Sequence, residues 1–375
     1  MSRKGENIYR RKDGRWEGRY IKERVNGKAC YRSVYAGTYR EVKEKLNMEK
    51  KRLAECGESV GNNAGKVSKV SQKWLEEMEG TLKESSIVKY EDLLRCYVLP
   101  EFGNSELSEI TNKQIIHFSS QLLAKGGAAG QGLAPATVLE VVSALNSMRI
   151  YALKRECRIS FSPDCISIKR EQKEIRVFSA AEENRLIFWL KNNLDLTNLG
   201  ILLCLFTGIR LGEVCALGWD DLDLTENILH VRKTMQRIRL KESEDKKTGV
   251  RIFEPKSSCS VRSIPIPQSL TDLLLPYRQE GTFFLTGKKE TFVEPRTLQN
   301  RFKTVLHRCG VEKANFHAIR HTFATRCVEL GFDVKSLSEI LGHASVAITM
   351  NRYVHPSMAL KSENMARLDA LFTVK

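Results

Sequence analysis

The chain has 375 residues, and its 61 lysines and arginines outnumber its 45 aspartates and glutamates, which leaves a formal net charge of +16. This length accommodates two or three domains, and the basic excess favours a polyanionic partner, because each neutralised DNA phosphate releases condensed counterions. No apolar stretch approaches the roughly 18 to 20 residues that span a bilayer, and the first residues do not lead into the apolar segment of a signal peptide. These features argue against a membrane or secreted protein and predict a cytoplasmic one.

The composition also argues against several cofactor-dependent chemistries. The ten cysteines are scattered singly, with no CxxC pair that would indicate zinc and no dense disulfide framework. The phosphate-binding pattern GxxxxGK[ST] is absent as well. We therefore expect reduced thiols, no bound metal and no cofactor.

Residues 1–60 form a basic module, with 17 lysines and arginines against 9 aspartates and glutamates, and so a net charge of +8. Apolar and charged residues alternate over 8–38, and Asn26-Gly27 is typical of a hairpin turn. The apolar spacing in 38–56 predicts one helix packed on the resulting sheet of two or three strands. Such a sheet can lay a strand face in a DNA major groove; the alternative is a basic surface that reads no bases. The candidate DNA contacts are Arg15, Arg19, Lys22, Arg24 and Arg32.

The middle of the chain has the pattern of a helical domain. Glycines and small polar residues in 57–65 are typical of a linker. Helical periodicity then predicts four or five helices, and the main segments are 87–98, 110–123 and 136–153. Ser85 or Ser86, and Thr111, are the expected N-caps.

A short charged segment, 168–176, precedes a further domain. Ser179 and Glu182 form a capping box that opens its first helix. Residues 228–239 and 250–266 have the pattern of strands in one small sheet. We therefore place the three domains at 1–57, 67–165 and 177–375.

Four separated motifs carry groups suited to chemistry at a phosphodiester. They are Thr207-Gly-Ile-Arg-Leu-Gly-Glu213, His317-x-x-Arg320, Leu341-Gly-His343 and Tyr353. In-line attack on phosphorus builds charge on the non-bridging oxygens, which fixed cationic donors stabilise. Arginine suits this role, because its planar fork bonds two oxygens and stays charged at every workable pH. A tyrosine hydroxyl can act as the nucleophile and store the bond energy as a phosphotyrosine ester.

The spacing of these motifs predicts where their side chains lie. His317 and Arg320 are three residues apart and share one face of a helix. The apolar pattern before Gly342 predicts a short helix that this glycine ends as a left-handed cap, so His343 projects from a fixed helix end. Tyr353 follows on or beside the next helix.

In order and spacing, the four motifs resemble the tyrosine recombinase, or phage integrase, family, and most of all the integrases of conjugative transposons and lambda-like phages. The resemblance implies that Arg210 and Arg320 clamp the scissile phosphate and that Glu213 supports Arg210. It also implies that His317 helps to activate Tyr353 as the nucleophile and that His343 is a second donor to the phosphate.

The family also uses a lysine on a β-hairpin as general acid toward the leaving 5′-hydroxyl. Residues 254–266 resemble that hairpin and favour Lys256. Lys246 and Lys247 are its rivals, although they lie beside Gly249 in a charged, turn-like stretch.

The patterns and the resemblance together imply an α+β multidomain fold. It would contain a small β-sheet-plus-helix arm-type DNA-binding domain, an all-α core-binding domain, and a mostly α catalytic domain with a small antiparallel sheet. The implied function is a site-specific DNA recombinase that integrates and excises a mobile genetic element through a 3′-phosphotyrosine intermediate. Expected partners are double-stranded DNA with core-type and arm-type sites, other copies in a homotetramer, an excisionase and a DNA-bending host protein.

Two alternatives stay open. A housekeeping chromosome-dimer resolvase would share the catalytic residues but would lack the basic N-terminal module. A catalytically silent DNA-binding regulator would share the fold without needing a tyrosine nucleophile.

Overall fold

The structure is a computed structural model. It describes residues 7–11, 13–25, 28–58, 65–127, 130–169, 176–240, 248–254 and 258–354, together with 362, 365, 366 and 368. The side chains of 21–25, 28–30, 50–58 and 258 lie outside that description. So do the three candidate lysines of the hairpin, Lys246, Lys247 and Lys256. The chain divides into two compact units, Met1–Arg170 and Glu171–Lys375.

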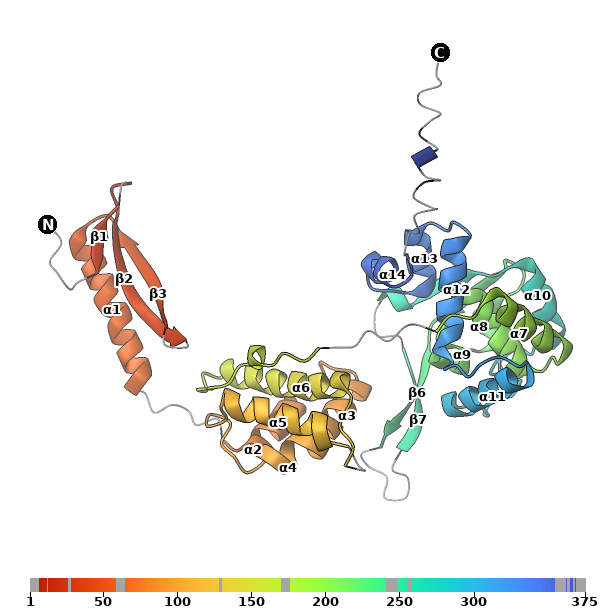
Figure 1. Cartoon of the computed structure of the whole chain (residues 1–375), viewed down its shortest axis with the longest axis horizontal. Coiled ribbons are helices and arrows are strands. Elements are labelled where there is room, and N and C mark those ends of the chain that lie inside the picture. Colours follow the sequence, from red (N-terminus) through yellow and green to blue (C-terminus); the bar gives the residue numbers. More distant parts are fainter. Residues whose placement is uncertain are drawn as a thin grey trace, which may run out of the picture. The chain divides into compact units, whose positions relative to one another are not determined.

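The N-terminal part of the first unit is a three-stranded antiparallel sheet with a helix across it (Figure 1). The strands are β1 (Ile8–Arg10), β2 (Trp16–Val25) and β3 (Lys28–Ala36), in that order, and α1 (Tyr39–Glu58) follows them. Strand alternation sends every second side chain toward the helix, so Tyr20 and Ala36 are buried with Val42 and Leu46. The predicted sheet-plus-helix arrangement is confirmed.

The rest of the first unit is helical. Its helices are α2 (Val67–Met78), α3 (Glu84–Leu93), α4 (Leu99–Phe102), α5 (Asn112–Lys125) and α6 (Pro135–Leu153), and a π-helical turn, Leu94–Val98, joins α3 to α4. Thr111 caps α5, as predicted, and forms a capping box with Gln114. The predicted serine cap of α3 is wrong, because the helix begins at Glu84 and Lys83 holds the N-cap position. A carboxylate in the first turn favours this earlier start by stabilising the positive end of the helix dipole.

The second unit is mostly helical. Its helices are α7 (Ala180–Asn192), α8 (Leu196–Thr207), α9 (Leu211–Ala216), α10 (Gln268–Leu274), α11 (Pro295–Arg308), α12 (His317–Glu329), α13 (Val334–Leu341) and α14 (Val346–Tyr353). The capping box of Ser179 and Glu182 opens α7, as predicted. The expected fold class, mostly helical with small antiparallel sheets, is confirmed.

The strands of the second unit form two sheets, whereas the sequence pattern predicted one. The first sheet has the strand order β4-β5-β8, where β4 is Leu222–Asp223, β5 is Ile228–Val231 and β8 is Arg262–Pro265. The second is a separate hairpin in which β6 (Thr234–Arg239) pairs with β7 (Thr248–Phe253) (Figure 1). The chain leaves the first sheet at Arg232 and Lys233. Both side chains are exposed, so this pair interrupts the burial pattern that a continuous strand would need.

The apolar helix α8 brings the four sequence motifs together. Its side chains from Leu199 to Leu205 are buried, and it contacts α12, which in turn contacts α13 and α14. Despite this apolar run, no helix within the described ranges is both long and apolar enough to cross a membrane. The site therefore forms at the ends of α8, α13 and α14 and along α12.

Candidate active site

Arg210 is held at the turn between α8 and α9. Helix α8 ends on Gly208, whose backbone is left-handed (φ 64°, ψ 15°), and Arg210 is the extended residue before α9. Its guanidinium donates to the Glu213 carboxylate at 2.7 Å and to the Gly342 carbonyl at 3.0 Å. The side chain remains 35% exposed, so it can still reach a ligand.

Glu213 is a buried carboxylate that two arginines share. It accepts the backbone N–H of Arg210 at 2.8 Å, and its two oxygens accept from the Arg262 guanidinium at 3.1 and 2.9 Å. Burial by itself would raise the pKa of Glu213, but the hydrogen bond from Arg262 and the charges of Arg262 and Arg210 outweigh it and lower the pKa to about 2. Glu213 is therefore ionised and orients both guanidiniums.

Arg262 is a residue of this network that the sequence analysis did not select. It begins β8, its side chain is 6% exposed, and its guanidinium also donates to the carbonyls of Ser260 at 3.1 Å and Ile340 at 2.6 Å. The second contact ties the sheet to the end of α13. One signal was present in the sequence: an arginine in a strand with apolar neighbours must be paired if it is buried.

Arg320 is the most deeply buried of these three arginines, with 2% of its surface exposed. It lies on α12 and donates to the carbonyls of Gly208 at 2.8 Å and Leu341 at 2.6 Å. Burial, and then the charge of Arg210, lower the pKa of Arg320 to about 9. An anion bound beside the two arginines would offset the cost of holding these charges together.

His343 follows the left-handed cap that the sequence predicted, since Gly342 ends α13 with φ 63° and ψ 49°. Its Nδ1 lies 2.8 Å from the hydroxyl oxygen of the buried Thr349. Burial, and then the charge of Arg320, lower the pKa of His343 to about 4. The ring is therefore neutral near pH 7, and its Nε2 is left to contact a ligand.

Tyr353 is the last residue of α14 and is 6% exposed. Its ring packs in a small apolar cluster with Ala324, Cys327, Leu337 and Leu341. Burial raises the pKa of the Tyr353 hydroxyl, and the charges of Arg320 and Arg352 partly offset that rise. The nucleophile candidate is therefore a protonated, sheltered hydroxyl that has to lose a proton in order to attack.

His321, a second residue that the sequence analysis did not select, is a hydrogen-bond partner of the Tyr353 hydroxyl. Nδ1 of His321 lies 2.9 Å from the hydroxyl oxygen. A side-chain hydrogen bond from Arg320 to Tyr353 also lowers the pKa of that hydroxyl. The rings of His321 and His317, one helical turn apart, meet edge to face with their centroids 4.5 Å apart. The four-residue spacing of the two histidines was the available signal, because it places them on one helix face.

His317, the predicted activator, is the outer member of that pair. His317 is an exposed residue, whereas His321 is 6% exposed. Partial burial of the His317 ring, and then the charge of Arg320, lower the pKa of His317 to about 4.

The structure thus brings six of the predicted residues into one site: Arg210, Glu213, His317, Arg320, His343 and Tyr353. Lys256 lies outside the described residues. Among the residues that the structure describes, no group of three or more His, Cys, Asp or Glu side chains is arranged to hold a metal ion. Guanidiniums and neutral imidazoles beside a tyrosine hydroxyl can bind phosphodiester oxygens and present an oxygen nucleophile to phosphorus.

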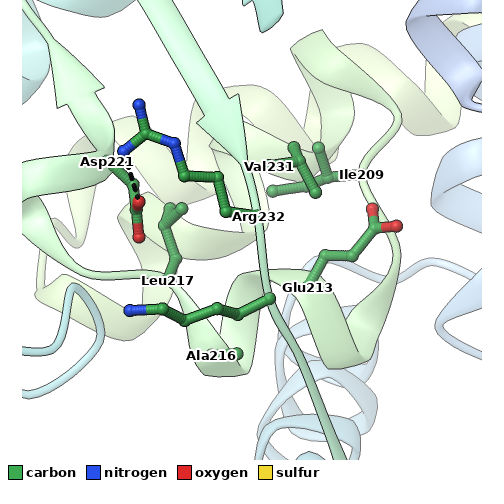
Figure 2. Close-up of a pocket in the computed structure, with 8 residues that line it drawn as sticks. Ile209, Glu213, Ala216, Leu217, Asp221, Val231 and Arg232 are labelled. Atoms are coloured by element: carbon green, nitrogen blue, oxygen red, sulfur yellow. Dashed lines mark hydrogen bonds and ion pairs between the residues drawn. The ribbon is translucent and has the colours of Figure 1, made fainter. Parts of the chain in front are cut away.

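A small pocket lies beside α9 and shares Glu213 with the site (Figure 2). Its lining residues are Ile209, Glu213, Ala216, Leu217, Asp221, Val231, Arg232 and Lys233. Figure 2 shows Arg232 turned toward Asp221, with which it forms an ion pair of 3.5 Å. The Glu213 carboxylate that lines the pocket is paired with Arg210 and Arg262. Lys233 adds a further cationic side chain to the pocket wall.

The N-terminal sheet gathers arginines around one carboxylate. Glu17 is 4% exposed and accepts hydrogen bonds from Arg11 at 3.0 Å, Arg19 at 2.8 Å and Ser33 at 2.7 Å. The hydrogen bonds from Arg19 and Ser33 are the main reasons why the pKa of Glu17 is lowered to about 2. The carboxylate therefore stays charged and orients the arginines beside it.

The predicted DNA contacts of this module fall on different faces. Arg19 lies beside Glu17, and Arg15 lies over the ring of Tyr35, its guanidinium carbon 5.7 Å from the ring centroid. Arg32 pairs in register with the buried Tyr20 and therefore shares the face that α1 covers. The side chains of Lys22 and Arg24 are outside the described residues.

Two family models match the chain. The model described as "Phage integrase family" matches residues 176–359, and that described as "Phage integrase, N-terminal SAM-like domain" matches residues 66–123. A protein named "Tyrosine recombinase XerC-like" from Caldanaerobacter subterraneus subsp. tengcongensis is 28% identical over 372 residues, which cover 92% of this chain and 93% of that protein. An "Integrase" from Saccharopolyspora erythraea is 24% identical and covers 97% of this chain and 96% of its own length.

Solved structures share the fold. The integrase of transposon Tn1549, in complex with transposon right end DNA, matches 80% of this chain and 99% of its own with a TM-score of 0.65 and 20% identity. A lambda integrase tetramer bound to a Holliday junction matches 96% of this chain and 99% of its own, with a TM-score of 0.56 and 14% identity.

Proposed function

Because the chain belongs to the phage integrase family of tyrosine recombinases, it is a site-specific DNA recombinase that cleaves and rejoins strands, and we propose that it integrates and excises a mobile genetic element. Its full-length similarity to a protein named as an integrase supports this assignment. The basic N-terminal module supports it further, because a resolvase that acts only on core sites has no need for a second DNA-binding domain.

One observation carries the assignment of the chemistry: a tyrosine hydroxyl lies in the same site as two buried or half-buried arginines. We propose that Arg210 and Arg320 bind the non-bridging oxygens of the scissile phosphate and that His343 donates a further hydrogen bond from Nε2. Tyr353 then attacks phosphorus to form a 3′-phosphotyrosine bond, and the 5′-oxygen leaves with a proton from Lys256. Glu213 orients Arg210 and does not touch the DNA.

The reverse step rejoins strands. A 5′-hydroxyl from the partner duplex attacks the phosphotyrosine and releases Tyr353, so the bond energy is conserved and no nucleotide hydrolysis is needed. The arginines supply the charge stabilisation that metal ions supply in other phosphoryl-transfer enzymes. We therefore expect cleavage without added metal.

A covalent-trapping experiment tests this proposal. Wild type and Tyr353→Phe are incubated with a nicked core-site duplex at matched DNA occupancy, with and without EDTA. We expect a denaturant-resistant protein–DNA adduct from wild type in both conditions and none from Tyr353→Phe. Loss of the wild-type adduct in EDTA would contradict the metal-independent mechanism, and its absence despite good binding would favour the silent-regulator alternative.

We further propose that the enzyme acts in the cytoplasm as a homotetramer on two DNA segments, with arm-type sites bound by the N-terminal sheet. An excisionase and a DNA-bending host protein would set the direction of the reaction.

The role of the N-terminal module can be tested by removing residues 1–64. We expect the shortened chain to cleave a core-site duplex at close to the wild-type rate but to lose integration into a target that carries arm sites. Integration would be measured as recombinant product per hour in a two-plasmid assay. Unchanged integration would favour the chromosome-dimer resolvase alternative.

A further inference from the structure

We infer that His321 is a catalytic residue of this enzyme, the base that takes the proton of Tyr353 during strand cleavage. The inference rests on the proposed function and refines it, since family resemblance pointed to His317. The contact that carries it is the 2.9 Å approach of His321 Nδ1 to the Tyr353 hydroxyl oxygen. A general base has to lie within hydrogen-bond reach of the proton that it removes.

The geometry distinguishes the two histidines of α12. The described ring contact of His317 is with His321, edge to face, and His317 lies at the exposed rim of the site. His321 is 6% exposed, and its ring centroid lies 5.7 Å from that of Tyr353. The buried histidine is the better proton acceptor here, because bulk water competes less with the tyrosine hydroxyl for the lone pair of the ring nitrogen.

The surroundings keep His321 neutral and ready to accept. Burial, and then the charges of the neighbouring groups, lower the pKa of His321 to about 4. Those groups are His317 and Arg320 on α12, Arg352 on α14, and His343 after α13. A bound DNA phosphate would place negative charge beside the ring and raise its proton affinity when the reaction requires it.

The proton balance of the step is complete. As the Tyr353 oxygen bonds to phosphorus, its proton moves to His321 Nδ1, and the bond from phosphorus to the 5′-oxygen breaks. The leaving 5′-oxygen takes a proton from Lys256. In rejoining, the incoming 5′-hydroxyl returns its proton to Lys256, and the protonated His321 returns a proton to the released tyrosine.

The test compares His321→Asn with wild type in single-turnover adduct formation at saturating core-site DNA. Asparagine can place an amide oxygen near the position of Nδ1, so it keeps a hydrogen-bond acceptor but cannot take up a proton. We expect the rate to fall by about 100- to 10,000-fold with DNA affinity unchanged. The wild-type rate should fall as the pH falls through the pKa of His321 in the complex. This fall is the acidic limb of the pH profile, and His321→Asn should lack this limb.

His317→Asn is the matched variant, one turn away on the same helix, and it is expected to keep the wild-type pH limb whatever its rate. Loss of the limb in His317→Asn but not in His321→Asn would overturn the inference. So would a His321→Asn rate within threefold of wild type, or faster, because the contact would then only hold the tyrosine at rest. A slow His321→Asn that keeps the limb would show positioning alone and would also overturn it.

Two results keep the inference separate from the proposed function and from simple misfolding. If wild type forms no adduct, the proposed function fails; if wild type forms one and His321→Asn behaves as wild type, only this inference fails. Should His321→Asn not fold, ¹⁵N NMR of the wild-type histidine rings gives the tautomer, with His321 identified by its contact with Tyr353. We expect the proton on Nε2; a proton on Nδ1 would overturn the assignment.

Discussion

Replacing Glu213 with alanine is expected to lower the free energy of unfolding by about 3 to 5 kcal/mol, because it leaves buried charge without its partner. The other described partners of Arg262 are the carbonyls of Ser260 and Ile340, which cannot neutralise it. The same change should abolish adduct formation, since Arg210 loses the carboxylate that orients its guanidinium. Urea unfolding followed by circular dichroism, and the trapping assay on the folded fraction, measure the two effects.

The charge on Glu213 also predicts the sign of a pH dependence. Its pKa is about 2 in the folded chain and roughly 4.3 when unfolded, so the stability that it contributes is complete above the unfolded value and is lost as the pH falls toward 2. That contribution is of the order of 3 kcal/mol. Glu213→Gln keeps the shape and removes the charge, so its deficit relative to wild type should be full at pH 7 and should shrink between pH 5 and 2. A deficit that stays constant with pH would show that shape, not charge, is what matters.

Replacing Gly208 with alanine is expected to lower the free energy of unfolding by roughly 2 to 5 kcal/mol, from two separate causes. The left-handed backbone, φ 64°, disfavours any L side chain. A Cβ there would also lie 2.4 Å from the ring of Phe323 and 3.0 Å from Leu341, so the packed neighbours must move. Because the Gly208 carbonyl accepts from Arg320, the shift should also slow cleavage well beyond the loss of folded protein.

Gly310→Ala is the matched control for that prediction. Gly310 has nearly the same backbone angle, φ 63°, and nothing lies within 4 Å of an added Cβ. It should therefore show the backbone cost of about 1 to 2 kcal/mol and an unchanged cleavage rate per folded molecule. Equal losses of stability and activity in the two variants would contradict the role given to the contact with Phe323 and to the Gly208 carbonyl.

Much of the local geometry of the site was predictable because it depends on residues that are near one another in sequence. A helix that ends at a glycine adopts the left-handed cap over a few residues, and this held for Gly342. The N-cap at Thr111 and the capping box at Ser179 held for the same reason. The cap of α3 was wrong, since two serines and a preceding acidic residue leave several starting points with similar free energies.

The assignment of strands to sheets could not be made in the same way. Residues 228–239 and 250–266 have strand-like patterns, but the pattern does not say which strand pairs with which. The chain pairs β5 with β8, across thirty or more intervening positions, and closes β6 on β7 as a separate hairpin. Pairing of this kind depends on how the helices pack around each sheet edge.

The sequence by itself determined the chemistry of this protein: arginines, histidines and a tyrosine in an order that suits attack on a phosphodiester, with a glycine, Gly342, that ends a helix beside them. Only the tertiary structure decided which groups meet. It places His321 against Tyr353 and pairs Arg262 with Glu213, because those contacts join residues 32 and 49 positions apart. Contacts over such distances are set by how α12 packs on α14 and where β8 lies beside α9, and no local preference of the chain encodes either.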